Sequence, residues 1–349
     1  MEEKYFAASN SGEGFVSYFG DIFSPARFDK IYIIKGGPGT GKSFFMRCVA
    51  DAAKKAHKKV VYYYCSSDQN SLDGIVIDGR VAVLDGTAPH DTDAMYPGAV
   101  ENLVDLGKFW DSEKLASERR VIERLCEGKK NGYARAYRYL SAYMDVSRAA
   151  ENLVTDALDR AKMRRCAENC LKKTVNGIDF TAKVGICGSV GMEGRVRFYT
   201  LCEKADNIYL VSDLYGSGHL FLAEIANIAA AKKLDVVFSY DPVCPDRLDA
   251  VYIEKGKLLF CTSCSEKKEN VKLINMGRFI VREKIKASVP EIKHAMRLRE
   301  ALIGEALDAL ANVKKVHFEI EEIYKSAMDF TAKEKFTRSF ASELIKGLK

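Results

Sequence analysis

The sequence predicts an α/β protein built from two tandem units, each with a parallel sheet flanked by helices. Three observations indicate this class. A glycine-rich loop stands between an apolar run and a helical segment, strands and helices alternate along the chain, and the second half repeats the pattern of the first. The length of 349 residues is enough for about two domains of ordinary size.

The repeat is visible as matched stretches in the same order. IYIIKGGPGTGKSFFMRC at 31–48 resembles IYLVSDLYGSGHLFLAEI at 208–225, which lies 177 positions later. Further along, DLGKFW at 105–110 resembles NMGRFI at 275–280, now 170 positions apart. We therefore predict a first unit over 1–178 and a second over 179–349.

Each unit is expected to follow one plan. An apolar strand leads into the glycine-bearing loop, and a helix with apolar residues at helical spacing follows, then two further strands and a long charged helical stretch. The matched segments are 31–34 and 208–211, 42–57 and 219–232, 60–64 and 236–240, and 81–84 and 258–261. The charged stretches, about 112–172 and about 281–326, are expected to form helical hairpins, because EGKKNGY at 127–133 has the punctuation of a turn.

The first glycine loop, 36–43, matches the phosphate-binding pattern G-x-x-x-x-G-K-[ST] with a strand before it and a helix after it. Glycines let the backbone wrap an anion closely, so that amide groups and the positive helix end face the phosphates. Lys42 is expected to reach the β- and γ-phosphates, and the Ser43 hydroxyl to bind Mg²⁺. The alternative is a glycine turn that only connects two elements. The predicted binding residues are Gly36, Gly37, Pro38, Gly39, Thr40, Gly41, Lys42, Ser43 and Phe44.

A P-loop NTPase fold also needs a carboxylate at a strand end to hold the magnesium shell. Asp85 follows four apolar residues and is the predicted metal and catalytic carboxylate, although Asp-Gly at 85–86 also suits a turn. Asp68 is the second candidate. His90 could orient water or sense phosphate, while capping of a loop is the alternative.

The second glycine loop, 213–220, has lost these groups. Asp213 replaces Gly36, His219 replaces Lys42 and Leu220 replaces Ser43. Aspartate repels phosphate, and leucine cannot bind magnesium. Thr262 stands where Asp85 would be expected. We interpret the second unit as degenerate and kept for its shape, packed against the first as an internal pseudo-dimer; the alternative is that 208–225 is unrelated to such a loop.

Composition excludes several classes of protein. A net charge of +6 is mild and permits nucleotides as partners without indicating DNA, and no nucleic-acid-binding motif is present. The start lacks a signal peptide, and the apolar run 220–231 is too short for a membrane span. Ten scattered cysteines indicate reduced thiols and a cytoplasmic location. Zinc or redox chemistry at Cys261 and Cys264 is the sharper alternative.

The chain resembles a little-characterised group of bacterial proteins with two P-loop modules in tandem, described simply as ATPases. The likeness covers essentially the whole length and rests on KGGPGTGKS at 35–43, DGTAPH at 85–90 and the YPGA…LG.FW pattern within 96–110. The resemblance implies ATP binding and hydrolysis. Members of the group often keep an intact second loop, and this chain departs from them there.

Three functions remain open. The first is an Mg-ATP-dependent ATPase or switch with one active site in the N-terminal half; the absence of an N/T-K-x-D motif favours ATP over GTP. A kinase with an arginine-bearing lid is the second, and a non-hydrolysing nucleotide sensor is the third. Arg247 is a candidate to reach the first loop from the other half. The possible lid arginines are Arg119, Arg120, Arg124, Arg135 and Arg138.

Overall fold

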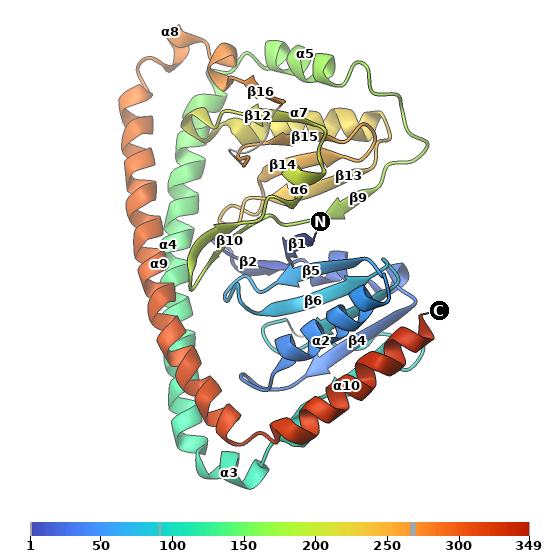
Figure 1. Cartoon of the computed structure of the whole chain (residues 1–349). Coiled ribbons are helices and arrows are strands. Elements are labelled where there is room, and N and C mark those ends of the chain that lie inside the picture. Colours follow the sequence, from blue (N-terminus) through green and yellow to red (C-terminus); the bar gives the residue numbers. More distant parts are fainter. Residues whose placement is uncertain (1, 91, 266–269, 349) are drawn as a thin grey trace.

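The computed structural model describes residues 2–90, 92–265 and 270–348. It is an α/β protein with two six-stranded sheets flanked by helices, one sheet in each half of the chain (Figure 1). The predicted α/β class, with a helix-flanked sheet in each half, is therefore confirmed. Across these residues, no helix combines the length and the apolar character needed to cross a bilayer.

The first sheet has the strand order β1-β5-β6-β7-β4-β8. Strand β4 lies between β7 and β8 and is parallel to both, and β1 is parallel to β5. The strands are β1 (Glu3–Phe6), β4 (Lys30–Lys35), β5 (Val60–Tyr64), β6 (Leu72–Ile77), β7 (Val81–Asp85) and β8 (Glu101–Asp105).

The sheets are mixed, so the predicted all-parallel arrangement is wrong. Strand β6 runs antiparallel to both β5 and β7. The chain reverses between β6 and β7 through Asp78 and Gly79, whose φ angles are +50° and +68°. Two consecutive positive φ values belong to the tight hairpin turn that Asp-Gly favours. The Asp-Gly pair at 78–79 is therefore a sequence feature that indicates a hairpin, and with it the antiparallel strand β6.

The second sheet repeats the first, with the order β16-β12-β15-β14-β13-β9 and β14 as its antiparallel strand. Each half also has a two-stranded ribbon before its glycine loop. This shared topology agrees with the predicted duplication. The elements are β9 (Ala182–Val184), β12 (Asn207–Val211), β13 (Val236–Tyr240), β14 (Leu248–Ile253), β15 (Leu258–Cys261), β16 (Val271–Ile274), and the ribbons β2 (Ala8–Ser11) with β3 (Gly14–Ser17) and β10 (Gly188–Gly191) with β11 (Gly194–Arg197).

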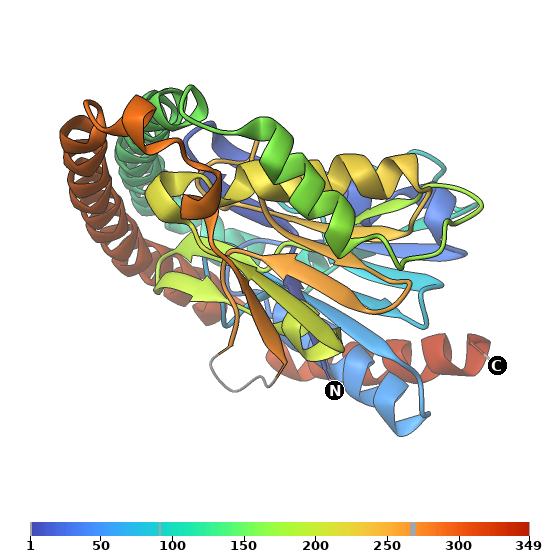
Figure 2. The same cartoon turned by 90° about the horizontal axis from the view of Figure 1, so that it is seen from above.

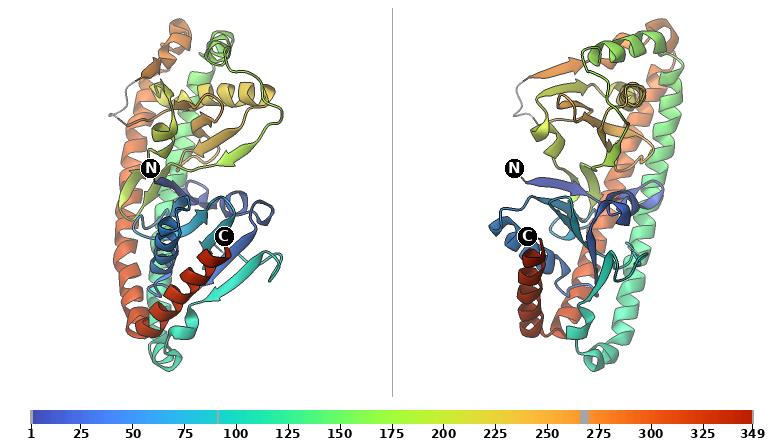
Figure 3. Two further views of the ribbon diagram at one scale, coloured as in Figure 1. Left: turned by 45° about the vertical axis from the view of Figure 1, so that its right-hand side comes forward. Right: turned by 90° about the vertical axis from the view of Figure 1, so that its right-hand side faces the viewer.

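Two long helices connect the halves and lie side by side along the molecule (Figure 3). They are α4 (Arg119–Thr155), of 37 residues, and α9 (Val289–Ser326), of 38 residues. The predicted helical hairpins are wrong, because the long helix of each charged stretch pairs with its counterpart from the other half and not with a helix of its own stretch. The equivalent residues Ala136 and Ala306 share one buried cluster where the two helices meet.

The supposed turn at 127–133 lies inside α4. Gly132 sits where α9 approaches closely, since a Cβ on it would lie 2.5 Å from Val313 Cγ2. Glycine here allows two helices to pack tightly, which is a second reason for glycine besides a turn. The sequence pattern alone could not separate these two reasons.

After each long helix, the chain crosses to the other half. Helix α10 (Phe330–Gly347) packs on α2 (Lys42–Lys55) of the first half, and Ala341 and Leu344 enter its core. In the same way α5 (Arg160–Cys170) packs on α7 (Gly218–Ala231) over the second sheet (Figure 2). The unit boundary at 178/179 stays a prediction. Across that boundary, α5 from the first half packs on the second, and α10 from the second half packs on the first.

Shorter helices complete the structure. Helix α1 covers the other face of the first sheet, where Phe19 and Ile22 pack with Ile31 and Ile33 of β4. The remaining elements are α1 (Phe19–Ile22), α3 (Ser112–Ser117), α6 (Thr200–Lys204), α8 (Arg282–Ile285), and the 3₁₀ turns η1 (Pro25–Arg27), η2 (Gly107–Phe109), η3 (Leu214–Gly216) and η4 (Met276–Phe279).

Candidate functional site

The first glycine loop joins the C-terminal end of β4 to the first residue of α2, Lys42. Gly39 and Gly41 have φ angles of +68° and +82°, which side-chain-bearing residues rarely adopt. The Thr40 hydroxyl donates to Gly37 O at 2.9 Å, and the Thr87 hydroxyl donates to Gly36 O at 2.9 Å. The backbone conformation of the loop thus depends on its glycines, and two hydroxyl groups donate hydrogen bonds to its carbonyl oxygens.

Lys42 and Asp85 lie together beside this loop. Lys42 Nζ is 3.5 Å from Asp85 Oδ2 and donates to Gly36 O at 3.1 Å and Gly37 O at 2.9 Å. Burial raises the pKa of the Asp85 carboxyl, although Lys42 and Thr87 act in the opposite direction. The structure therefore brings together the predicted lysine and the predicted strand-end carboxylate.

Ser43 and Phe44 follow Lys42 in the first turn of α2. The Ser43 hydroxyl accepts a hydrogen bond from Leu72 N at 3.0 Å, so its proton and second lone pair stay available to another partner. Phe44 is 43% exposed. Asp68, the second carboxylate candidate, accepts from the Ser71 hydroxyl at 2.6 Å and from Asn70 N at 3.1 Å, which makes it the cap of its own turn.

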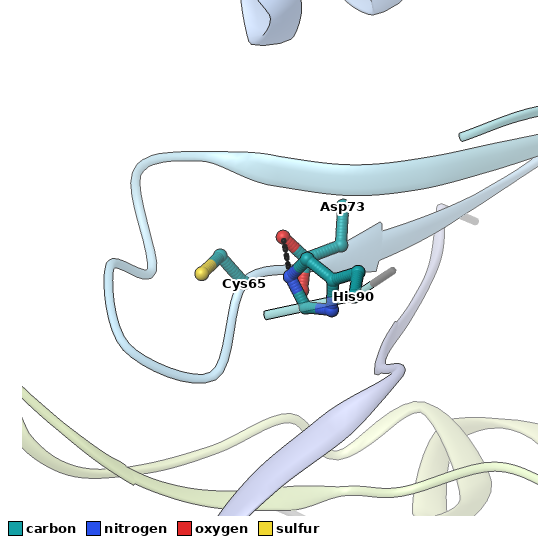
Figure 4. Close-up of side chains that lie close together, drawn as sticks. All are labelled: Cys65, Asp73 and His90. Carbon is teal, nitrogen blue, oxygen red and sulfur yellow. Dashed lines mark ion pairs between the residues drawn. The ribbon is translucent and has the colours of Figure 1, made fainter. Parts of the chain in front are cut away.

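The buried side chains of His90 and Asp73 lie together with the half-buried Cys65 (Figure 4). His90 Nε2 lies 3.3 Å from Asp73 Oδ1, and the His90 ring stacks on Phe19 with centroids 4.4 Å apart. Cys65 Sγ, one Asp73 oxygen and one His90 nitrogen lie within 4.8 Å of one another. The thiol, the carboxylate and the imidazole of these three residues could together hold a metal ion.

The repeat supplies another interpretation of this cluster. Asp249 in β14 corresponds to Asp73 in β6, and Arg197 forms an ion pair with Asp249. A buried carboxylate needs a cationic partner. Burial lowers the pKa of His90, whereas Asp73 and Asp85 raise it. The effect of the two carboxylates is larger, so the pKa of His90 lies above its ordinary value. The upward shift favours the charged form of His90, which would balance Asp73 as Arg197 balances Asp249.

Residues of the second half close over the first glycine loop. A Cβ on Gly37 would lie 2.8 Å from Tyr324 Cε1, and one on Gly39 would lie 2.7 Å from Glu321 O; both partners belong to α9. One on Gly41 would lie 2.5 Å from Lys333 Nζ in α10. Sequence reasoning missed these residues because they lie far away in the chain, and no motif marks them.

A line of ionisable groups also runs across the two long helices here. Lys129 Nζ is 3.1 Å from His317 Nδ1, and His317 Nε2 is 3.4 Å from Glu321 Oε1. Burial lowers the pKa of Lys129. Hydrogen bonding from His317, followed by Lys325, lowers the pKa of Glu321 to about 2. The Glu321 carboxylate is therefore ionised beside the loop at neutral pH.

The second glycine loop is occupied by protein groups. Gly218 N donates to Asp213 Oδ1 at 2.9 Å, so this backbone amide of the loop already has an acceptor within the protein. His219 Nε2 lies 3.1 Å from Glu151 Oε1, and Arg247 Nη2 lies 2.5 Å from Glu151 Oε2. Arg247 thus pairs with Glu151 of α4 beside the second loop, which contradicts its candidate role at the first loop.

Comparison with known proteins gives one partial match. The family model described as "Nephrocystin 3, N-terminal" matches residues 19–76, which include β4, the first glycine loop, α2, β5 and most of β6. This match covers less than a fifth of the chain. No curated protein and no solved structure matches the chain. The resemblance to the bacterial tandem ATPases is not supported by these comparisons and stays a prediction.

Proposed function

We propose that this chain binds Mg-ATP at its first glycine loop and works as an ATPase or ATP-driven switch of the P-loop NTPase fold with one active site. The observation that carries the proposal is the contact between Lys42 and Asp85 beside a loop that matches the full phosphate-binding pattern. The second loop offers no such site, because Asp213 and Glu151 already occupy its donors.

The chemistry follows from the groups beside the loop. A triphosphate would replace the carbonyl oxygens of Gly36 and Gly37 as partners of Lys42, which neutralises charge on the transferring phosphate. The Ser43 hydroxyl would bind Mg²⁺, and Asp85 would hold its water shell. Ionised Glu321 and neighbouring His317 are the nearby groups suited to orient water.

The two halves would then act as an internal pseudo-dimer whose second half is degenerate. Supporting this, α9 and α10 of the second half touch the glycines of the first loop. Changes in the loop on ATP binding or hydrolysis would move these helices, and with them α4. All ten cysteines are free thiols, which supports a cytoplasmic location.

The kinase alternative receives less support from the candidate arginines. Arg119 pairs with Glu123 on the exposed side of α4, and Arg135 lies 3.9 Å from Glu305 on an exposed surface. Their contacts place these two arginines on helix surfaces. Phosphate release measured with and without small-molecule acceptors separates hydrolysis from transfer.

The test is isothermal titration calorimetry with Mg-ATP and Mg-GTP, together with an assay of ADP release. Lys42→Ala should weaken ATP binding at least about tenfold, because a charge-assisted contact with phosphate is lost. His219→Ala, at the equivalent position of the second loop, is the matched control and should leave affinity unchanged. Equal ATP affinity in wild type and Lys42→Ala would disprove the proposed site, and binding without turnover would identify a sensor.

A further inference from the structure

Lys333 is a buried cation of the second half that faces the first glycine loop. Its side chain comes from the first turn of α10, and the residue is 3% exposed. The nearest point of the loop is Gly41, on which a Cβ would lie 2.5 Å from Lys333 Nζ. The ammonium group therefore stands directly against the last glycine before Lys42.

The ammonium group has no ion-pair partner in the described part of the chain, although the charge of the neighbouring Glu334 favours its charged form. Among the described residues, none forms an ion pair with Lys333, and its nearest aromatic faces are Phe44, with Nζ 4.3 Å from the ring centroid, and Phe330, at 5.5 Å. Burial lowers the pKa of Lys333. A buried cation without an anionic partner is unfavourable, and an arriving anion relieves that cost. Packing of the aliphatic stem alone would let the charged end turn toward water instead.

The second half contains a residue equivalent to Lys333, and it lies beside the glycine loop that has no lysine. Helix α5 is the counterpart of α10, and both begin after an aspartate cap, Asp159 and Asp329. Met163 N donates to Asp159 O, just as Lys333 N donates to Asp329 O. Met163 therefore corresponds to Lys333, and it packs in an apolar cluster with Phe221, the counterpart of Phe44.

The two substitutions go together. Beside the first loop, which has Lys42, the facing helix presents a cation; beside the second, which has His219, it presents methionine. A purely structural role would be served equally well by methionine at both positions, since Met163 is fully accommodated at 2% exposure. The cation is thus linked to the loop that can bind phosphate.

We propose that Lys333 binds the diphosphate part of the nucleotide held by the first loop, so that the site is composed of both halves of the chain. This inference rests on the proposed function of that loop. The diphosphate is the part concerned because the loop amides around Gly41 cradle the α- and β-phosphates, while Lys42 reaches the γ-phosphate. Lys333 should therefore contribute to ADP and ATP binding alike.

The first experiment compares Lys333→Met with wild type by calorimetry, using Mg-ADP and Mg-ATP and the full chain. Methionine is the natural residue at the equivalent position, so the fold should be retained, and a thermal melt checks this. The expected result is a loss of about tenfold in affinity for both nucleotides. Lys335→Met, an exposed neighbour on α10, is the matched control and should bind like wild type.

The second experiment does not depend on a variant. An acyl-phosphate derivative of ADP transfers its acyl group to a lysine amine beside the phosphates and releases ADP. Mass spectrometry should find Lys42 and Lys333 acylated, with excess ADP protecting both.

Unchanged affinity of Lys333→Met, or acylation of Lys42 without Lys333, overturns this inference and leaves the proposed function standing. If wild-type protein binds neither nucleotide, the proposed function itself has failed.

Discussion

Glu151 in α4 and Glu321 in α9 occupy equivalent positions 170 residues apart, yet they have different partners. Glu151 joins His219 of the second loop to Arg247, whereas Glu321 contacts His317 and Lys325 of its own helix. Each glutamate comes from the half opposite the loop that it adjoins. Beside the second loop, Glu151 is held in a cluster with His219 and Arg247, while beside the first loop the ion pairs of Glu321 are with His317 and Lys325 rather than with Lys42.

This difference predicts that the two glutamates affect stability unequally. Glu151→Gln leaves Arg247, whose side chain is 9% exposed, without its ionised partner, so we expect a loss of about 2–4 kcal/mol in the free energy of unfolding. Glu321→Gln removes contacts made within one helix and should cost about 1 kcal/mol or less. Urea unfolding followed by circular dichroism measures both. Equal losses would contradict the structural role assigned to Glu151.

The metal role proposed for Asp85 predicts a specific change in magnesium dependence. Asp85→Asn removes the carboxylate that would hold the Mg²⁺ shell, so the gain in ATP affinity that Mg²⁺ provides should fall at least about tenfold. Binding measured in EDTA should change little. Asp68→Asn, in the turn after β5, is the control and should keep the magnesium effect. The opposite pattern would move the metal carboxylate to Asp68.

The His90–Asp73 pair predicts a pH dependence of known sign. The folded-state pKa of His90 is raised above its ordinary value of about 6.5, so its pairing stabilises the fold fully below that value and loses effect as pH rises through the folded pKa. Asp73 and Asp85 favour the charged ring, and Lys42 opposes it. The melting temperature of wild type relative to His90→Gln should therefore be steady below about pH 6.5 and fall as the pH rises above it.

The pH dependence of the melting temperature also distinguishes a bound metal ion from a protonated His90 in the cluster of Cys65, Asp73 and His90. Metal binding by Cys65, Asp73 and His90 strengthens as its ligands lose protons, so stability would rise with pH and fall on adding a chelator. A stability difference that grows with pH would overturn the assignment of His90 as the counter-ion of Asp73.

The close approach of the long helices predicts opposite effects for two glycines of α4. Gly132→Ala places a Cβ 2.5 Å from Val313 Cγ2, and Val313 is buried, so we expect a loss of about 1–2 kcal/mol. Gly128→Ala meets no atom within 4 Å and should gain up to about 1 kcal/mol from helix propensity. Thermal unfolding of both variants is the check. Stabilisation by both would show that α9 does not constrain Gly132.

Local patterns predicted the centre of each unit well. β4, α2, β5 and β7 begin and end within about two residues of the expected bounds, because apolar periodicity and glycine punctuation act over neighbouring residues. The antiparallel β6 was missed although Asp78 and Gly79 signalled it. The prediction of helical hairpins was wrong because Gly132, which permits close packing of two helices, cannot be told in the sequence from a glycine that ends a helix.

One intact glycine loop, one degenerate copy and the repeated order of strands and helices follow from the amino-acid sequence alone, because these features depend on residues that are neighbours in the chain. The crossing of α5 and α10 to the other half, and the contact of Lys333 with Gly41, 292 positions away, depend on how the folded chain packs. The physical reason is the packing of α4 against α9. A long helix must bury its apolar stripe, and here the available partner belongs to the other half.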